Sequence, residues 1–248
     1  MARIRKDHPR LFFNADTWPA VKERALTACK DHFAEVKRHA DGPWADEGGE
    51  WAVIERPPAR PGSSVDVRDW GKQLMAAALA HRVEPSPQRL QRIKDMLWAS
   101  LDYYHACYAA GQDVSWYSTS RIGWLCAFDW VWRELRPDER REMGASMLRH
   151  VDDALHKPNI QRRNLAGFQS GYYGADNIAF FAGVVFLNEV IDDARALMCL
   201  RTGYNEYQKL LPYRAKLAGD DGGGASPTLG YTLAASGRAE WNFFHAWH

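Results

Sequence analysis

The chain lacks the cysteine and hydrophobic patterns that mark several classes of protein. Its four cysteines lie far apart, at Cys29, Cys107, Cys126 and Cys199. Because no Cys-x-x-Cys pair is present, the spacing gives no support to a zinc or thioredoxin-like motif, and we expect no metal or other cofactor. Free thiols buried on helices are expected, although the spacing leaves a disulfide open. No run approaches the roughly 20 apolar residues that a transmembrane helix needs, so no membrane partner is expected.

An excess of one charge is also missing. The chain has 32 Lys and Arg against 31 Asp and Glu, which gives a net charge of +1. This balance argues against a nucleic-acid binder that relies on a strong positive field. The basic start, residues 1–6, is not followed by the apolar core of a signal peptide. We therefore expect a cytoplasmic protein, or one whose signal has been removed.

Tryptophan is the compositional anomaly. The 248 residues include 11 tryptophans, and Trp116, Trp124, Trp130 and Trp132 lie close together in the sequence. An indole ring offers a flat apolar face with a polar N–H, which suits stacking on a sugar as well as core packing. Trp124 is therefore a candidate substrate-binding residue, with a core position as the alternative.

The apolar pattern is helical nearly throughout, and strand signals are few. Leu90, Ile93, Leu97, Leu101 and Tyr104 are spaced as one apolar face of a helix. Another helix is predicted from Pro137, with Met143, Met147, Val151 and Leu155 as its buried stripe. The remaining helices are predicted over 14–39, 65–81, 121–135, 177–190 and 192–211, and from about Pro227, with polar loops over 41–64 and 159–173.

These helices define an all-α fold class. Short connections between consecutive amphipathic helices favour antiparallel helical hairpins. Helices in pairs fit a bundle, a solenoid or a closed α/α toroid, and no sharp repeat selects among them. The last residues, 241–248, are apolar and aromatic and carry no capping signal. We therefore expect the chain to be a fragment, or a domain whose partner is missing.

The most informative stretch is the acidic, glycine-rich segment 219–231. Its consecutive glycines, 222–224, allow unusual backbone angles and a close approach to a ligand. Pro227 suits the first turn of a helix, because its missing N–H would be unpaired there anyway. Tyr231 follows about one turn later, where a phenol could donate or accept a proton. The alternative is a surface turn followed by an ordinary core tyrosine.

Several segments, in this order, together resemble the helical domain of the heparinase II/III-type polysaccharide lyases. They are His8-Pro-Arg-Leu-Phe-Phe-Asn14, then Leu125-Cys-Ala-Phe-Asp-Trp130 with Leu135-Arg-Pro-Asp-Glu-Arg140, then Asp176-Asn177 before an apolar helix, and last Asp221-Gly-Gly223 with Ser226-Pro227 and Tyr231. The similarity covers most of the chain.

The resemblance implies that residues 1–248 form an incomplete α/α toroid built from antiparallel hairpins. It implies truncation before the last helices and before a C-terminal β-sandwich domain, which supplies a catalytic histidine in relatives. It also implies a periplasmic or secreted protein. The partner would be an acidic, uronate-containing polysaccharide, heparan sulfate-like or alginate-like, cleaved by β-elimination.

The resemblance also assigns roles to residues. The amide of Asn177 would hydrogen-bond the uronate carboxylate and stabilise the charge that develops on it. Tyr231 would be the general acid and could also be the base. The candidate substrate-binding residues are Trp124, Gln169, Tyr173, Asp176 and Arg238. The alternatives are a helix N-cap for Asn177, compatible with catalysis, and a surface salt bridge for Arg238.

Two other functions remain open at the level of the sequence. A glycoside hydrolase on a similar toroid needs two carboxylates in one cleft, and Asp129, Asp176, Asp220 and Asp221 are available without an obvious pairing. Asp129 is interpreted as structural, holding backbone or an arginine. The third possibility is a helical domain that binds glycans without cutting them, which the aromatic loops also fit.

Overall fold

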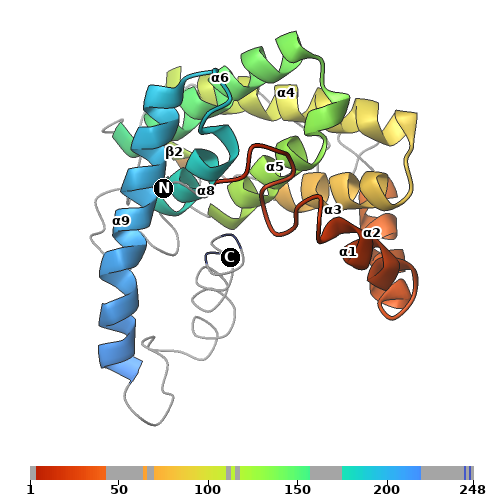
Figure 1. Cartoon of the computed structure of the whole chain (residues 1–248). Helices are drawn as coiled ribbons and strands as arrows, with labels where there is room; N and C mark the ends of the chain where they lie inside the picture. The colour runs from red at the N-terminus through yellow and green to blue at the C-terminus, as the bar shows by residue number, and fades with distance from the viewer. Residues whose placement is uncertain are drawn as a thin grey trace.

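The computed structural model describes residues 4–42, 64–65, 70–109, 113–114, 118–156, 175–218, 243 and 246. These residues are mostly helical, which confirms the all-α prediction (Figure 1). Two strands of two residues each, β1 (Ser64–Val65) and β2 (Asp113–Val114), pair in parallel. The helices are α1 (Trp18–Leu26), α2 (Lys30–Asp41), α3 (Trp70–Val83), α4 (Pro87–Ala109), α5 (Ser118–Trp130), α6 (Pro137–His156), α8 (Ala175–Phe186) and α9 (Asp193–Ala218), with a short 3₁₀ turn, η2 (Trp132–Glu134).

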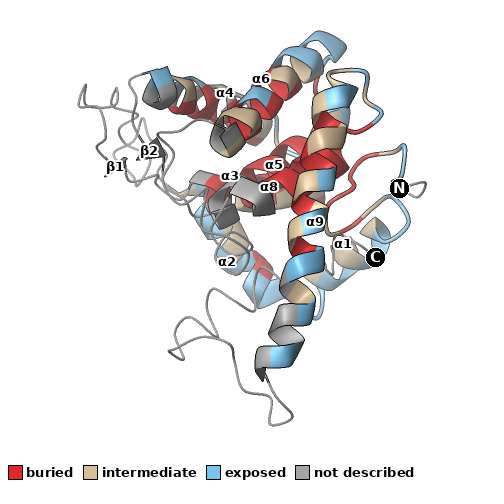
Figure 2. Ribbon diagram, turned by 90° about the vertical axis from the view of Figure 1, so that its left-hand side faces the viewer, coloured by how far each residue is buried: buried red, intermediate tan, exposed pale blue. Residues whose placement is uncertain are grey.

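The helices form two layers that alternate along the chain. The inner layer consists of α3, α5 and α8. Every residue of 122–130 in α5 and of 178–186 in α8 is buried, as expected of helices covered on all sides (Figure 2). The outer helices α2, α4, α6 and α9 each bury one face. The predicted stripes are confirmed: Leu97 and Leu101 of α4 and Met143 and Met147 of α6 are fully buried.

Successive helices within a layer run in the same direction. In the outer layer, Lys94 pairs with Glu139, and ten residues further along α4 the ring of Tyr104 stacks on His150 of α6. In the inner layer, Gly71 faces Gly123 near the start of α3 and α5, and Arg82 donates to the carbonyl of Trp130 near their ends. Matching positions therefore rise together in α4 and α6 and in α3 and α5, which is what a series of similar antiparallel hairpins requires.

The α8–α9 hairpin depends on two glycines. A Cβ on Gly203 of α9 would lie 2.6 Å from the Cα of Phe180, and a Cβ on Gly183 of α8 would lie 2.5 Å from the Cα of Leu200. These pairs show that α8 and α9 are antiparallel, because one number falls as the other rises. Only glycine allows the two backbones to approach so closely.

This arrangement gives the inner layer two different ends. At the C-terminal ends of the inner helices, the chain passes to the next outer helix through short connections, 84–86, 131–136 and 187–192. At the N-terminal ends, the chain enters from the outer layer through longer connections, 42–69, 110–117 and 157–174. The pairing of β1 with β2 supports this topology, because they precede α3 and α5 and still meet. We call these two ends the short-connection end and the long-connection end.

The N-terminal segment, residues 4–17, is fastened across the short-connection end by the carboxylate of Asp129. One oxygen accepts hydrogen bonds from the backbone N–H groups of Arg10 and Leu11 at 2.8 and 2.9 Å, and the other lies 2.5 Å from Nδ1 of His8. The carboxylate is 0% exposed. Asp129 thus holds backbone, as the sequence analysis interpreted it. Two segments that carry the family resemblance, 8–14 and 125–130, contact each other through this residue.

Two arginines satisfy the buried C-terminal carbonyls of the inner helices. The guanidinium of Arg10 donates to the carbonyls of Val184, Val185 and Leu187 at the end of α8. Arg82 donates to the carbonyl of Trp130 at the end of α5 and lies over the ring of Trp18. The last carbonyls of a helix have no partner within it, and a cation there also complements the helix dipole.

Two predicted helices are wrong in part. The helix predicted over 14–39 is divided into α1 and α2, because Thr27 bonds back to the carbonyl of Glu23 and the N–H of Cys29 turns back to Arg24. The helix predicted over 177–190 ends at Phe186, since Asn188 and Val190 have positive φ angles of 68° and 57°.

Smaller shifts affect other predicted bounds. The helix predicted to start at residue 65 begins at Trp70, and the one predicted to end at 135 stops at Trp130 before η2. The helix predicted over 192–211 continues across Pro212 to Ala218. The loop predicted over 159–173, and nearly all of the loop over 41–64 and of the last predicted helix, lie outside the described residues.

We expect Gly203→Ala to destabilise the fold. The added methyl group overlaps the backbone of Phe180, and such overpacking costs about 1–3 kcal/mol. Asn205→Ala is the matched control, because Asn205 is exposed two residues further along α9. Urea unfolding followed by circular dichroism measures both. Equal stability of Gly203→Ala and the parent would contradict the described packing of α8 on α9.

Asp129→Ala tests the fastening of the N-terminal segment. Removing one partner of a buried charged pair leaves the others uncompensated, and we expect a loss of about 3–5 kcal/mol in the free energy of unfolding. Asp138→Ala, which removes an exposed carboxylate paired with Arg136, should leave it almost unchanged, because exposed ion pairs contribute little. A similar loss for both variants would show that Asp129 has no special structural role.

Candidate functional site

Two of the residues that the sequence nominated lie at the long-connection end. Asp176 and Asn177 lie in the first turn of α8, which begins at Ala175. Gln169 and Tyr173 precede α8 in the connection from α6, outside the described residues. Tyr231 and Arg238 follow α9 and also lie outside them. The backbone positions of Asp176 and Asn177 are described, whereas their side chains are not, so the substrate and catalytic roles stay predictions.

The helix bounds bear on the alternative role of Asn177. Because α8 begins two residues earlier, at Ala175, Asn177 occupies the first turn and not the capping position. The backbone N–H groups of a first turn have no partner within the helix, and they carry the positive end of the helix dipole. A helix start of this kind favours a negatively charged group beside it.

Phe243, near the end of the chain, packs against α8 and α9. Its ring stacks on Tyr207 of α9 with centroids 4.0 Å apart, and it lies 4.9 Å from the ring of Phe180 of α8. Phe180 is three residues after Asn177, so the two share a face of α8. The segment 219–242 therefore connects the end of α9 at Ala218 to Phe243, which contacts α8 close to its start.

Trp124 lies in the core between α4, α5 and α6. It is 1% exposed, and its indole N–H donates to Oγ of Ser100 at 3.0 Å. The rings of Tyr104 and His150 meet it edge to face. These contacts are those of a core residue, which was the alternative given for Trp124. Its predicted contact with substrate stays a prediction.

A polar cluster that the sequence did not nominate lies next to Trp124. Nε2 of His105 is 2.9 Å from Oγ of Ser146, and its Nδ1 is 4.0 Å from the carboxylate of Asp153. Ser146 is nearly buried in the middle of α6, where the helix itself uses the backbone N–H groups that could otherwise bind an oxyanion. The cluster ties α4 to α6. The seven-residue spacing of Ser146 and Asp153 places both on one face of α6 and can be read from the sequence. The contact of His105 with them can be seen only in the tertiary structure.

Two of the cysteines are not nucleophiles. Burial, reinforced by the charge of Asp129, raises the pKa of the Cys126 thiol well above its usual value. Burial raises the pKa of Cys199 to about 12. Both thiols therefore stay protonated near neutral pH and are unreactive. Cys29, Cys126 and Cys199 are free, as expected, and the side chain of Cys107 is not described.

Neither a metal centre nor a membrane span is found in the described part of the chain. Among those residues, no three His, Cys, Asp or Glu side chains come together in a way that could hold a metal ion. Over the same ranges, no helix combines the length and the apolar character needed to cross a membrane.

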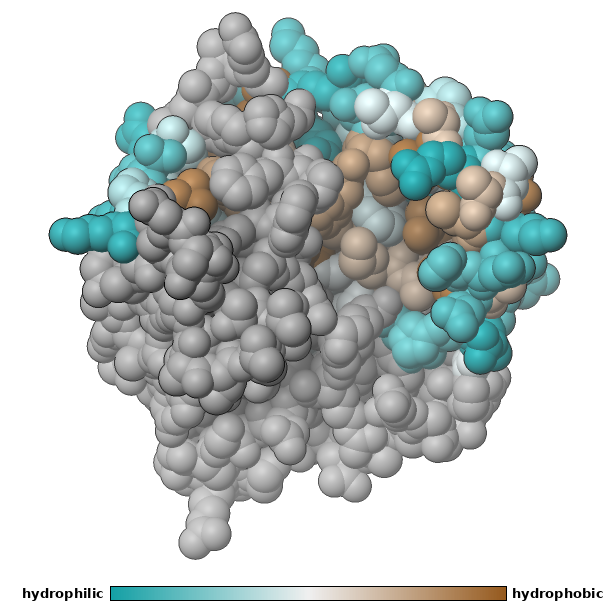
Figure 3. All heavy atoms as spheres, turned by 90° about the horizontal axis from the view of Figure 1, so that it is seen from below, coloured by the Kyte–Doolittle hydropathy of each residue, from teal (hydrophilic) through white to brown (hydrophobic). Residues whose placement is uncertain are grey.

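Figure 3 shows the molecule from below. On the side of this face where the described residues are visible, apolar side chains gather, and hydrophilic side chains lie along their outer border.

Comparison with known proteins gives no match, so a function has to be argued from this geometry. No protein-family model matches the chain, and neither a curated protein nor a solved structure matches it. The resemblance to the heparinase II/III-type lyases therefore rests on the quoted sequence segments.

Phe243→Ala tests whether the end of the chain is docked against α8 and α9. Phe243 is buried against Phe180 and Tyr207, and truncating a buried phenylalanine costs about 3–5 kcal/mol. Leu26→Ala, at a side chain that is 47% exposed, is the control and should cost less than about 1 kcal/mol. Thermal unfolding measures both, and unchanged stability of Phe243→Ala would contradict the docking.

Proposed function

We propose that the chain is the helical domain of a polysaccharide lyase, similar to the heparinase II/III type, which cleaves a uronate-containing acidic polysaccharide by β-elimination. In this proposal the hairpins curve into an incomplete α/α toroid. The alternation of inner and outer helices, with parallel neighbours in each layer, is what such a toroid requires. It supports the toroid over a four-helix bundle, in which all helices share one layer around one core.

The observation that carries the proposal is the common end at which the long connections enter the inner layer. Asn177 belongs to α8 at this end. Because α9 runs antiparallel to α8, its C-terminal end, which leads to Tyr231, also lies on the side where α8 begins. Phe243 then packs on Phe180, as the next inner helix would. Active sites are commonly built from loops at one end of a rigid scaffold.

The proposed chemistry follows from the weak acidity of the uronate C5 proton. That proton is lost readily only when the adjacent carboxylate is neutralised. The amide of Asn177, with the positive end of the α8 dipole, would stabilise the charge that the carboxylate gains as C5–H breaks. The electron pair then forms the C4–C5 double bond and the C4–O bond breaks. Tyr231 would give its proton to the leaving oxygen, and in its ionised form it could first take the C5 proton.

The remaining nominated residues would hold the polysaccharide. Gln169, Tyr173 and Asp176 belong to the same connection and helix start as Asn177. An amide, a phenol and a carboxylate there can bond to the hydroxyl groups of a sugar ring. Arg238, seven residues after Tyr231, would pair with a substrate carboxylate.

Ultraviolet absorbance of the unsaturated product tests the proposal. Heparan sulfate, hyaluronan, chondroitin, alginate and ulvan serve as the substrate panel. Loss of a general acid or base lowers the rate by about 10²–10⁴-fold, which we expect for Tyr231→Phe. Loss of a donor to the developing charge lowers it by about 10²–10³-fold, which we expect for Asn177→Ala.

Tyr204→Phe and Asn205→Ala are the matched controls for these two variants, because they make the same chemical changes at residues of α9 that the sequence did not nominate for catalysis. Absorbance that survives in Tyr231→Phe would remove Tyr231 from the mechanism. New reducing ends without absorbance would indicate a glycoside hydrolase. Binding without either product would indicate a glycan-binding domain, and both outcomes would overturn the lyase proposal.

A further inference from the structure

A pocket lies at the short-connection end, opposite the proposed catalytic end. It has a volume of about 290 Å³ and is lined by Trp132, Arg140, Arg141, Glu189, Val190 and Ile191, among others. The start of α6 supplies the two arginines, and the turn between α8 and α9 supplies the last three residues. Because α8 has 12 residues, this turn lies about 18 Å from the start of the helix. The pocket is therefore separate from the residues nominated for catalysis.

The pocket carries positive charge that the described residues do not neutralise. In the described ranges, neither Arg140 nor Arg141 has a carboxylate within ion-pairing distance. The guanidinium of Arg140 lies over the ring of Trp132, 5.3 Å from its centroid, and reaches only the carbonyl of Arg133 at 3.5 Å. Its Nε is buried without a hydrogen-bond partner. A guanidinium in this state can receive a carboxylate through two parallel hydrogen bonds.

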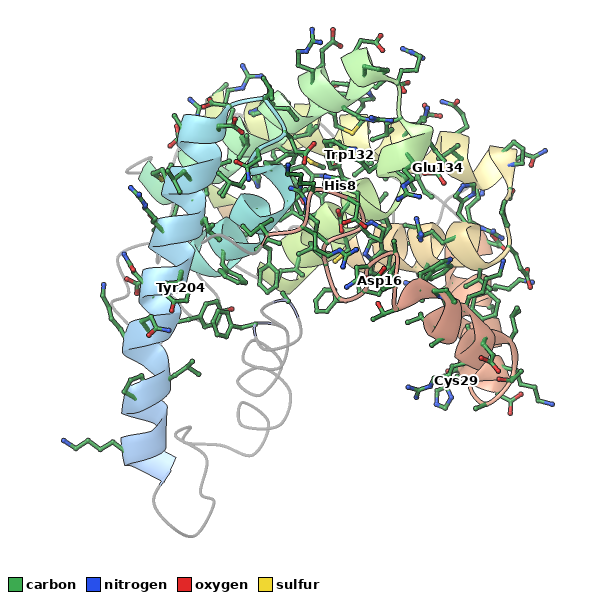
Figure 4. The ribbon with its side chains drawn as sticks, viewed as in Figure 1. His8, Asp16, Cys29, Trp132, Glu134 and Tyr204 are labelled. Carbon is green, nitrogen blue, oxygen red and sulfur yellow. The ribbon has the colours of Figure 1, made fainter. Side chains whose placement is uncertain are left out.

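The acidic side of the pocket is fixed in place. The carboxylate of Glu189 pairs with the buried guanidinium of Arg10 and lies 3.2 Å from Nε2 of His8. His8 in turn stacks on Trp132 with ring centroids 3.9 Å apart, and the two rings lie side by side in Figure 4. Since Arg10 already balances its charge, Glu189 can accept hydrogen bonds from hydroxyl groups without cancelling the charge of the two pocket arginines.

The apolar side of the pocket is held in an unfavourable conformation. Val190 is 85% exposed, and its φ angle of 57° is rare for a β-branched residue. The turn is held by the N–H of Asn188, which donates to the carboxylate of Asp193 at 3.0 Å. Residues in such sparsely populated backbone conformations cluster at active sites and ligand clamps.

We infer that this pocket binds a compact polyhydroxylated monocarboxylate, of which a hexuronic acid is the representative. The carboxylate would pair with Arg140 and Arg141, the hydroxyl groups would donate to Glu189, and the apolar face of the sugar would pack on Val190 and Ile191. This inference does not rest on the lyase proposal, because it uses none of the residues nominated for catalysis.

Titration of the 248-residue chain with sodium D-glucuronate, followed by nuclear magnetic resonance, tests the inference. The methyl resonances of Val190 and Ile191 and the indole resonance of Trp132 should shift, whereas methyl glucoside, which has no carboxylate, should leave them unchanged. Glucuronate carries no substituent at O4 that could be eliminated. Binding is therefore measured whether or not the chain has lyase activity, and a failed activity assay would not affect the result.

Variants decide whether the pocket arginines are responsible. Arg140→Gln and Arg141→Gln should each raise the dissociation constant at least about tenfold, as for the loss of a charge-assisted hydrogen bond. Arg149→Gln, at an exposed position of the same helix outside the pocket, should leave it unchanged. Val190→Glu adds a negative charge at an exposed rim position, where it should weaken binding without affecting folding.

Three results would overturn the inference. They are shifts confined to residues outside the pocket, equal weakening by Arg149→Gln, and equal shifts with methyl glucoside.

Discussion

The buried carboxylate of Asp129 is the interaction on which the short-connection end of the fold depends. A charge in a fully buried position is costly unless all of its hydrogen-bonding capacity is used. Here two backbone N–H groups and an imidazole nitrogen use it, and all three belong to the N-terminal segment. The segment that follows Lys6 is therefore held against the end of α5. That contact in turn brings Arg10 to the carbonyls that end α8.

The two ends of the inner layer have different roles because of this fastening. At one end, Asp129, Arg10 and Arg82 satisfy the buried helix termini, and short connections leave little chain to rearrange. At the other end lie the N-terminal ends of the inner helices, and the connections are longer. In many proteins a rigid scaffold positions the loops that carry function. Here the short-connection end corresponds to the scaffold, and the long-connection end corresponds to the functional loops. The pocket beside Trp132 does not follow this division, because it lies at the rigid end and is lined by a strained turn.

The sequence predicted those features that depend on local chemistry. Pro137 with the acidic residues after it predicted the start of α6, and the spacing from Leu90 to Tyr104 predicted one face of α4. The structural role of Asp129 was also predicted. The break at Thr27 was missed because a threonine side chain bonded back to the helix competes with its continuation. The end of α8 was missed because the apolar run 178–187 continues past Phe186, and its turn is set by Asp193.

The sequence by itself determined the helical class and the approximate positions of most of the described helices, because apolar periodicity and turn chemistry are local properties. The tertiary structure decided which helices are covered on all sides and which connections share an end, because both depend on how hairpins stack. It also brought His105 to Ser146, His8 to Asp129 and Arg140 to Trp132. These contacts join residues from 8 to 121 positions apart, and no periodicity in the chain records such distances.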